Sequence, residues 1–247
     1  HNVNLVYTYL PTSADKTYFL PPTLTNGNVH GIIVLNVYNE RLLRLLAETQ
    51  IPKVFLDTSS LVAPDELNGD LLLMESRTSV RRITSHLLEQ GRTLPGFIGD
   101  IGYAQSNRER YEGFCQALTD AGKKVDSSLC LTTPLGIDTY REEIDTFLSS
   151  LSRMPDAFVC ASDYVACILM QLLEKRGLRV PEDVAVSGFD NNTEDLLAEH
   201  LTTVQVFNEE LGARLALQIL YRIKYPNTPH EITYLGTNVL YRDSTGD

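Results

Sequence analysis

Residues 177–190 read GLRVPEDVAVSGFD, and this stretch decides the fold. Gly177 ends a helical pattern, and the mostly apolar run Val184–Phe189 follows within a few residues. A run without regular polar alternation is typical of a strand buried on both faces, as in parallel sheets covered by helices. Asp190 follows this run directly. The stretch therefore predicts a parallel strand with a carboxylate at its carboxyl end.

Further β-rich runs occur before and after this predicted strand in the sequence. Helical patterns separate the β-rich runs: one begins near Ser106, one runs from Ser162 to Gly177, and one runs from Asn208 to just before Pro226. Regular alternation of strands and helices predicts an α/β doubly wound protein. The predicted strands are Val3–Leu10, Gly31–Asn36, Lys53–Asp57, Leu71–Glu75, Gly96–Asp100, Leu129–Thr133, Ala157–Ser162, Val184–Asp190 and Thr203–Phe207.

The helix that starts near Ser106 carries a recognisable initiation signal. Ser106 is followed three residues later by Glu109, the spacing of a capping box, in which the two side chains satisfy each other's backbone amides. Gly122 ends the pattern. We therefore expect Ser106 to be the N-cap, with Arg110 one turn into the helix.

Composition excludes several classes of protein. The chain has 247 residues, 43% of them hydrophobic, and a net charge of −11. So acidic a surface is not expected to bind duplex DNA, which requires clustered Lys and Arg. No apolar run reaches the length of a membrane span, and the first residues lack a signal-peptide pattern, so the sequence predicts a cytoplasmic protein. The four cysteines form no CxxC pair and read as buried free thiols.

Polar residues follow several predicted strands. In open α/β sheets, ligands bind beyond the carboxyl ends of the strands. Carboxylates accept hydrogen bonds from paired hydroxyls, and a guanidinium donates a planar fork, so such a group of side chains suits a polyhydroxylated ligand. The residues in these positions are Asn36, Asp57, Ser162 and Asp190, joined by Arg110 from the helix after Gly96–Asp100.

Signatures of catalysis are weak. Gly96, Gly99 and Gly102 have the spacing of a phosphate loop, but no Lys-Ser/Thr follows them. There is no G-x-S-x-G motif, and the five histidines lack metal-ligand spacing. Two carboxylates at a cleft could serve glycoside hydrolysis, but an arginine between them fits a binding pocket better. We therefore expect a non-enzymatic protein that needs no cofactor and no metal.

A set of short segments, in a fixed order along nearly the whole chain, resembles the effector-binding domain of the LacI/GalR family of bacterial transcription regulators. The block 177–191 is the most specific of them. The others are Gly31-Ile-Ile-Val-Leu, Ile51-Pro-Lys-Val-Phe-Leu-Asp57, His86-Leu-Leu-Glu-Gln-Gly91, Arg110-Tyr-Glu-Gly-Phe114, Leu201-Thr-Thr-Val204, Glu210-Leu-Gly212 and Tyr241-Arg-Asp-Ser-Thr245.

The resemblance implies two Rossmann-like lobes of the periplasmic-binding-protein type, joined by three crossovers. The N-terminal lobe would comprise 1–75 and 208–234, and the C-terminal lobe 76–207 and 235–247. Val3–Leu10 matches the family's second strand. The family's first strand and first helix, its helix-turn-helix headpiece and its hinge helix have no counterpart in these 247 residues.

The resemblance also implies a function. A sugar or related small metabolite would bind in the cleft between the lobes of a homodimeric repressor and control operator binding by the absent headpiece. Arg110, Asp190, Asp57, Ser162 and Asn36 match effector-contacting positions, and Ile137 falls near a position where relatives place an aromatic residue. Three departures are Val206-Phe207 in place of Gln-Pro, Gly91-Arg92 in place of Gly-His, and Glu75-Ser76 in place of Asp-Asn.

One alternative shares this fold. A periplasmic or lipid-anchored sugar-binding protein that serves a transporter would show the same alternation of strands and helices. Leu201-Thr-Thr-Val204 and the ending Tyr241-Arg-Asp-Ser-Thr245 look like the regulators. The sequence therefore favours a regulator and keeps the transporter protein as the second reading.

Overall fold

The computed structural model describes residues 3–136, 138–192 and 199–247, which fold into two compact units. Unit 1 contains His1–Leu73 and Asn208–Leu235, and unit 2 contains Met74–Phe207 and Gly236–Asp247. The chain therefore passes between the units three times. The boundaries expected from the sequence lie after residues 75, 207 and 234, at most two residues from these.

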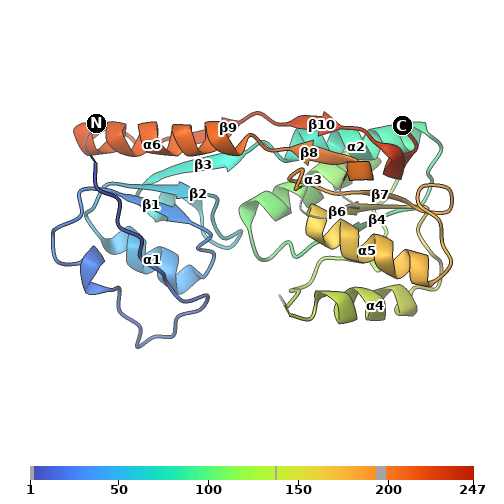
Figure 1. Ribbon diagram of the computed structural model, residues 1–247, viewed down its shortest axis with the longest axis horizontal. Coiled ribbons are helices and arrows are strands. Elements are labelled where there is room, and N and C mark those ends of the chain that lie inside the picture. Colours follow the sequence, from blue (N-terminus) through green and yellow to red (C-terminus); the bar gives the residue numbers. More distant parts are fainter. Residues whose placement is uncertain (1–2, 137, 193–198) are drawn as a thin grey trace. The chain divides into compact units, whose positions relative to one another are not determined.

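Unit 1 is built on a four-stranded sheet in the order β1-β2-β3-β9. The first three strands run parallel, as expected for apolar runs separated by helical segments. Helices α1 and α6 lie on opposite sides of the sheet (Figure 1). The elements are the 3₁₀ turns Pro22–Leu24 and Pro64–Leu67, β1 (Ile32–Leu35), α1 (Glu40–Glu48), β2 (Lys53–Leu56), β3 (Asp70–Met74), α6 (Asn208–Lys224) and β9 (Ile232–Leu235).

Unit 2 holds a second parallel sheet, in the order β5-β4-β6-β7. Helices α2 and α3 cover one side of it, and α4 and α5 cover the other (Figure 1). The elements are α2 (Arg77–Glu89), β4 (Pro95–Ile98), α3 (Gln105–Asp120), the 3₁₀ turn Ser127–Leu129, β5 (Cys130–Leu131), α4 (Tyr140–Ser150), β6 (Ala157–Cys160), α5 (Asp163–Lys175) and β7 (Ala185–Ser187).

The last segments of unit 2 extend this sheet. The strand β8 (Thr203–Gln205) lies beside the end of β7, through parallel bridges that join Ser187 to Thr202 and Asp190 to Gln205. β10 (Asn238–Leu240) pairs with β8 in antiparallel register, and the 3₁₀ turn Asp243–Thr245 follows it. The mixed α/β architecture with parallel sheets confirms the fold class expected from the sequence.

A glycine sets the distance between the helices α2 and α3. A Cβ at Gly113 would lie 2.2 Å from the backbone oxygen of Arg77, well inside van der Waals contact. Arg77 also pairs with Glu112, one residue earlier on α3. The two helices can approach this closely only because residue 113 has no side chain. This contact fixes the helix that carries Arg110.

Two local expectations are wrong. Residues 3–10 form no strand, and Tyr7 and Tyr9 are exposed. A strand needs a neighbour to satisfy its backbone groups, and no strand within the described residues pairs with this segment. The N-cap of α3 is Ala104, which makes no side-chain cap, so the capping box is not formed. Ser106 lies inside the helix and is buried with Glu109. The sequence also did not predict β9 and β10.

Among the described residues, no helix combines the length and the apolar character needed to cross a bilayer. All four cysteines are free. Cys160 and Cys167 are buried as expected, whereas Cys115 and Cys130 are only partly buried.

Candidate functional site

Arg110 lies buried at the carboxyl ends of the strands of unit 2. Its side chain is anchored on α3, and the residue is only 4% exposed. The guanidinium carbon lies 3.6 Å from the ring centroid of Phe189, which is a cation–π contact. Nη1 donates a hydrogen bond to the backbone oxygen of Ala161, directly after β6, and Nη2 lies 3.6 Å from Oδ1 of Asp190. Helix α3 therefore brings Arg110 to the ends of two strands.

The guanidinium of Arg110 has a donor that the described residues do not satisfy. Its Nε is buried and has no partner among the described residues. The separation of 3.6 Å from Asp190 is an ion-pair distance, but it exceeds the usual length of a hydrogen bond. Buried donors are nearly always satisfied in folded proteins, so an unpaired one indicates a place for an acceptor. An oxygen-rich ligand would supply that acceptor.

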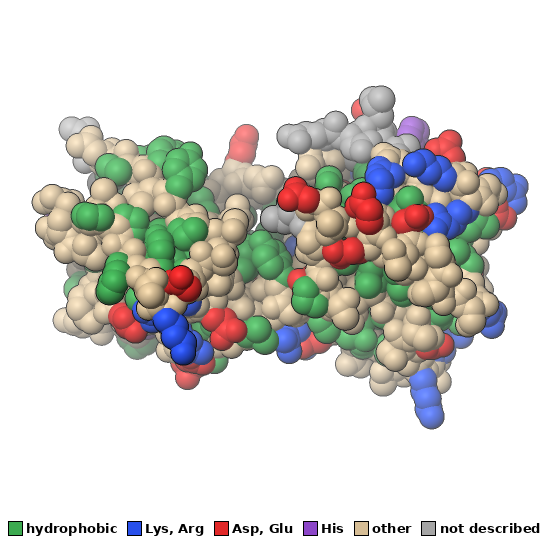
Figure 2. All heavy atoms as spheres, turned by 90° about the horizontal axis from the view of Figure 1, so that it is seen from below, with side chains coloured by type: hydrophobic (Ala, Val, Ile, Leu, Met, Phe, Trp, Pro, Cys, Tyr) green, Lys and Arg blue, Asp and Glu red, His purple; other side chains and the backbone are tan. Residues whose placement is uncertain are grey.

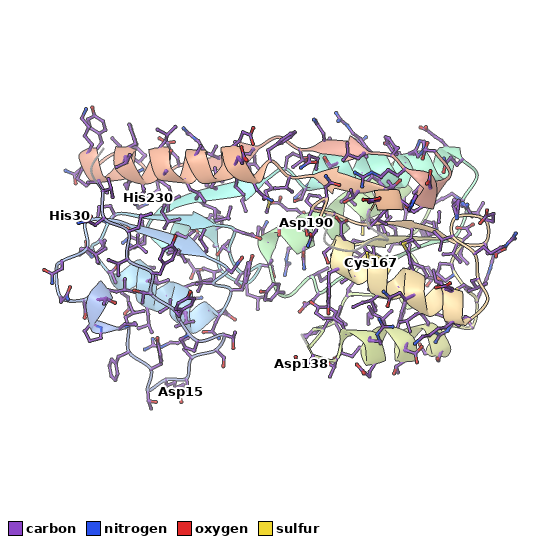
Figure 3. All side chains as sticks on the ribbon, in the orientation of Figure 1. Asp15, His30, Asp138, Cys167, Asp190 and His230 are labelled. Atoms are coloured by element: carbon purple, nitrogen blue, oxygen red, sulfur yellow. The ribbon has the colours of Figure 1, made fainter. Side chains whose placement is uncertain are left out.

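Asp190, labelled in Figure 3, is the partly exposed carboxylate beside Arg110. Its side chain is 44% exposed, yet protein atoms surround the carboxylate closely enough that desolvation raises its pKa, while the charge of Arg110 acts to lower it. Its amide donates to the backbone oxygen of Val204 at 3.0 Å, which holds the residue against β8. The carboxylate can therefore accept hydrogen bonds from a ligand beside Arg110.

Three of the candidate residues share an unusual backbone conformation. Asn36, Asp57 and Asp190 each follow a parallel strand, and their φ angles are +55°, +60° and +107°. This left-handed region is costly for residues other than glycine, and such strain is concentrated at functional sites. At these strand ends the chain turns sharply while still presenting a polar side chain. No motif in the sequence predicted this backbone conformation.

The strand ends of unit 1 differ from each other in burial. Asp57 is buried, and its Oδ1 accepts a hydrogen bond from the amide of Thr58 at 2.8 Å. The hydroxyl of Thr58 is also buried and has no partner among the described residues. Asn36 is exposed. The sequence analysis did not single out Thr58, because its buried hydroxyl becomes apparent only in the folded structure.

Ser162 has a structural role that is visible in the fold. It is the N-cap of α5, and its hydroxyl accepts a hydrogen bond from the amide of Val165 at 3.3 Å. Ile137 lies outside the described residues. Arg108, on the same helix as Arg110, is half-buried with a buried Nε. Two further residues that the sequence analysis missed, Phe189 beneath Arg110 and the buried Asp163, belong to the same part of unit 2.

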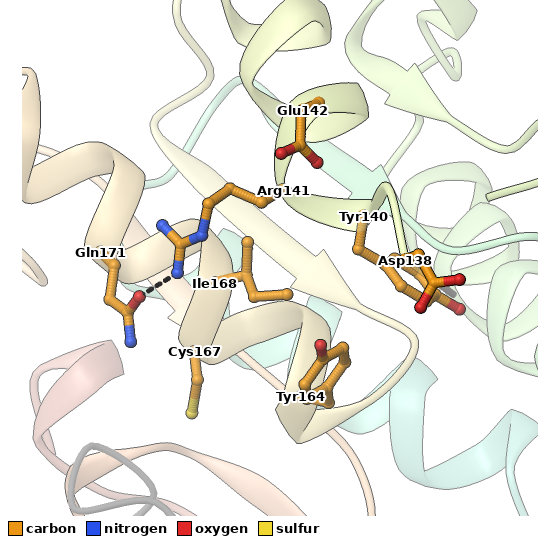
Figure 4. A pocket seen from close by; sticks show the side chains of 8 residues that line it. All are labelled: Asp138, Tyr140, Arg141, Glu142, Tyr164, Cys167, Ile168 and Gln171. Carbon is orange, nitrogen blue, oxygen red and sulfur yellow. Dashed lines mark hydrogen bonds between the residues drawn. The ribbon is translucent and has the colours of Figure 1, made fainter. Parts of the chain in front are cut away.

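A separate hollow of about 350 Å³ lies between α4 and α5 in unit 2 (Figure 4). Tyr140 and Tyr164 line it in an edge-to-face pair with centroids 5.7 Å apart, and Arg141 bonds Gln171 across it. It does not include Arg110 or Asp190. We place the candidate site at Arg110, because a buried, incompletely paired guanidinium is a stronger indication of a ligand than a shallow hollow.

The described residues contain no cluster of three or more His, Cys, Asp or Glu side chains placed to hold a metal ion. The Arg110 site offers hydrogen bonding and charge. It combines a donor fork, an acceptor carboxylate and an aromatic ring.

Comparisons with known proteins agree with this architecture. Residues 84–245 match the family model described as a periplasmic binding protein-like domain. The HTH-type transcriptional repressor PurR of Glaesserella parasuis serovar 5 (strain SH0165) is 27% identical over 216 residues, which are 87% of this chain and 62% of that protein. The HTH-type transcriptional regulator DegA of Bacillus subtilis (strain 168) is 31% identical over 170 residues, 68% of this chain and 48% of that protein.

Solved structures give the same result. The transcriptional regulator CelR in complex with cellobiose matches with a TM-score of 0.80 and 27% identity, over 90% of this chain and 68% of that one. A LacI-family regulator from Sanguibacter keddieii DSM 10542 matches with a TM-score of 0.72 and 25% identity, over 92% of this chain and 80% of that one.

The chain spans 62% of the length of the PurR relative and 48% of the DegA relative. These relatives are transcriptional regulators, which favours the regulator over the transporter protein that the sequence kept as an alternative. The family model covers well over half of the chain. The chain thus belongs to the periplasmic binding protein-like domain family, in the form of a LacI/GalR effector-binding domain.

Proposed function

We propose that this chain is the effector-sensing core of a LacI/GalR-type repressor and that it binds a sugar or related polyol without converting it. The observation that carries the proposal is the buried guanidinium of Arg110, which lies on the ring of Phe189 beside Asp190 with Nε unpaired. Adjacent hydroxyls can accept from the guanidinium and donate to the carboxylate. A single diol can therefore satisfy both side chains.

The remaining candidates are assigned secondary roles. Ser162 adds a hydroxyl from the start of α5. Asp57 and Asn36, at strand ends of unit 1, remain candidates that the family resemblance implies. The cellobiose bound to the regulator CelR is the type of ligand that this chemistry suits. Ile137 remains a candidate from the sequence alone.

The other partners follow from the family. We propose that the protein acts in the cytoplasm as a homodimer, with operator DNA bound by a headpiece outside these 247 residues. The net charge of −11 supports this division, because the chain itself is not suited to a phosphate backbone. An effector changes DNA affinity only if it binds one conformation of the protein more tightly than another. Light scattering tests the dimer, and a gel-shift assay in which this chain alone bound an operator would contradict the division.

The experiment for the site is a thermal-shift screen followed by calorimetry. The panel contains cellobiose, ribose, glucose, glycerol and glucose 6-phosphate. A sugar present at a hundred times its Kd should stabilise the chain by about 2.7 kcal/mol. Arg110→Ala should then lower the affinity for that sugar about tenfold or more, because the buried acceptors of the sugar lose their donors. Asp190→Asn should lower the affinity less than Arg110→Ala does, since the amide side chain retains one acceptor oxygen.

Arg81→Ala is the matched control. Arg81 is an exposed arginine on α2 of the same unit, and its Nε donates to Asp120 at 2.7 Å. Its removal should leave sugar binding unchanged. The proposed site is wrong if Arg110→Ala binds the sugar as tightly as Arg81→Ala does. The proposed ligand class is wrong if no member of a broader panel of sugars, polyols and sugar phosphates stabilises the chain.

A further inference from the structure

Asp163 is a buried carboxylate whose contacts join three segments of unit 2. It is the first residue of α5 and is only 2% exposed. Its Oδ1 accepts a hydrogen bond from the Thr203 hydroxyl at 2.6 Å, and its Oδ2 accepts one from the amide of Asn192 at 2.7 Å. Its own amide donates to the backbone oxygen of Phe189 at 2.8 Å. One residue therefore ties the start of α5 to β8 and to the turn 189–192.

That turn carries one side of the candidate site. Phe189 supplies the ring beneath the guanidinium of Arg110, and Asp190 supplies the carboxylate beside it. The approach of Asp163 to the turn is close, since a Cβ at Gly188 would lie 2.3 Å from Oδ1 of Asp163. Asp163 therefore contributes to the position of the turn, together with the hydrogen bonds from the Asp190 amide to Val204 and from the Asn191 amide to the Thr203 hydroxyl.

We propose that Asp163 is a positioning residue for the Arg110 site, whose carboxylate seats the turn Phe189–Asn192 against the guanidinium. The inference rests on the proposed function, because the seating affects binding only if Arg110 and Asp190 contact the effector. Asp163 itself faces α5, β8 and the turn, and it does not have to touch the ligand.

The position of the turn depends on the protonation of Asp163. Burial raises the pKa of Asp163 to about 6, against the hydrogen bonds from Thr203 and Asn192. The charged groups facing it are Asp190, which raises the pKa further, and Arg242, which lowers it. In a turn displaced into water, Asp163 would regain its ordinary pKa near 3.8. The seated turn thus binds a proton more tightly than the displaced one, so seating is favoured at low pH and weakens as the pH rises from about 4 to 6.

Amide hydrogen exchange of the whole chain, followed by NMR without any ligand, tests this proposal. After correction for the intrinsic exchange rate at each pH, protection of the Asn192 amide should fall by up to about tenfold per pH unit between roughly pH 4 and 6, the slope of one linked proton. Asp163→Asn should remove this pH dependence, because the amide side chain does not titrate. Asp163→Ala should lower protection of Asn192 at every pH and shift the Nε–H resonance of Arg110.

Asp156→Asn is the matched control in the same unit. Asp156 also accepts from two backbone amides, those of Thr93 and Leu94, at 2.6 and 2.9 Å, but it precedes β6, at the opposite edge of the sheet. This variant should reduce protection at Thr93 and Leu94 and leave Asn192 unchanged. Amides of α4 report whether each variant remains folded.

Three results would overturn the proposal: a flat pH profile in the wild-type chain, a retained profile in Asp163→Asn, or an equal loss of protection at Asn192 and in α4 in Asp163→Ala. The last would show a merely structural residue. Failure of the proposed function would give a different result. A chain that binds no sugar but shows the expected exchange profile would support the role of Asp163 in positioning the turn and would contradict only the proposed ligand.

Discussion

Asp70 in unit 1 and Asp163 in unit 2 are both buried aspartates, and they are held in opposite ways. In unit 1, Asp70 at the start of β3 forms a bidentate ion pair with Arg222 of α6, at 2.6 and 3.0 Å, and both side chains are 2% exposed. In unit 2, the donors to Asp163 among the described residues are neutral, namely the Thr203 hydroxyl and the Asn192 amide. The burial of the two residues is alike, but the charge of the partner is not.

The difference appears in the pKa of each carboxyl group. Burial alone would raise the pKa of Asp70, but hydrogen bonds from Arg222, Gln218 and the Glu231 amide hold it below its ordinary value. For Asp163 burial prevails, and its pKa rises to about 6. A buried carboxylate is thus ionised at little cost where a guanidinium lies beside it, and is close to titrating where only neutral donors do.

The largest expected effect is in unit 1. Arg222→Met leaves Asp70 buried without its charge partner and also removes the donors to the Thr228 and Pro229 carbonyls. We expect a loss of about 3–5 kcal/mol in the free energy of unfolding, measured by urea denaturation. Combining it with Asp70→Leu should restore much of the loss, since no charge then remains unpaired. A loss below about 1 kcal/mol would contradict the view that this pair anchors α6 to the sheet.

The second effect concerns pH and has opposite signs in the two units. Asp70, with a lowered pKa, stabilises the fold above the unfolded value of 3.8, and this contribution is lost as the pH falls through its folded pKa. Asp163, with a raised pKa, contributes most below 3.8, and its contribution is lost as the pH rises towards about 6. A shift of this size in Asp163 corresponds to about 3 kcal/mol.

Denaturation of Asp70→Asn and Asp163→Asn from pH 2.5 to 7.5 checks this prediction. Relative to the wild type, Asp163→Asn should flatten the stability profile between about pH 4 and 6, and Asp70→Asn should flatten it below about pH 4. Identical profiles for the two variants would mean that the charge of the partner does not decide the titration.

The smallest expected effects compare two helix glycines. Gly113→Ala on α3 should cost about 1–3 kcal/mol, because the new methyl group meets the Arg77 carbonyl and forces α2 and α3 apart. A Cβ at Gly212 on α6 would meet no heavy atom within 4 Å. Gly212→Ala should therefore stabilise unit 1 by about 0.5–1 kcal/mol, through helix propensity alone. Thermal unfolding of the two variants distinguishes them, and equal effects would show that α2 and α3 can move apart freely.

The units also differ in the apolar surface they expose. Of the large hydrophobic side chains that are exposed in the described part of the chain, fourteen belong to unit 1 and four to unit 2. Val3, Leu5, Tyr7 and Tyr9 are among them, in a segment whose sequence alone predicts a strand. Hydrophobic side chains are visible over the surface of unit 1 in Figure 2. Local β-propensity was thus insufficient where no neighbouring strand was present to pair with it.

Much of the fold was predictable because its signals are local. Apolar runs of strand length and helical periodicity placed β1 to β8, and polar residues at strand ends indicated the edge where a ligand could bind. The sequence analysis assigned Arg110 and Asp190 to the same ligand site, and in the structure Nη2 of Arg110 lies 3.6 Å from Oδ1 of Asp190. The capping box at Ser106 failed because the same short motif is compatible with a buried position inside a helix.

The sequence by itself determined the α/β alternation, the parallel strands and the polar character of their ends, since each depends on residues close together in the chain. Only the tertiary structure decided the left-handed turns at Asn36, Asp57 and Asp190, the stacking of Arg110 on Phe189, and the opposite titration of Asp70 and Asp163. Asp70 meets Arg222 across 152 residues and Asp163 meets Thr203 across 40. Burial and charge partners arise from contacts between such distant segments, and a pattern read along the chain does not contain them.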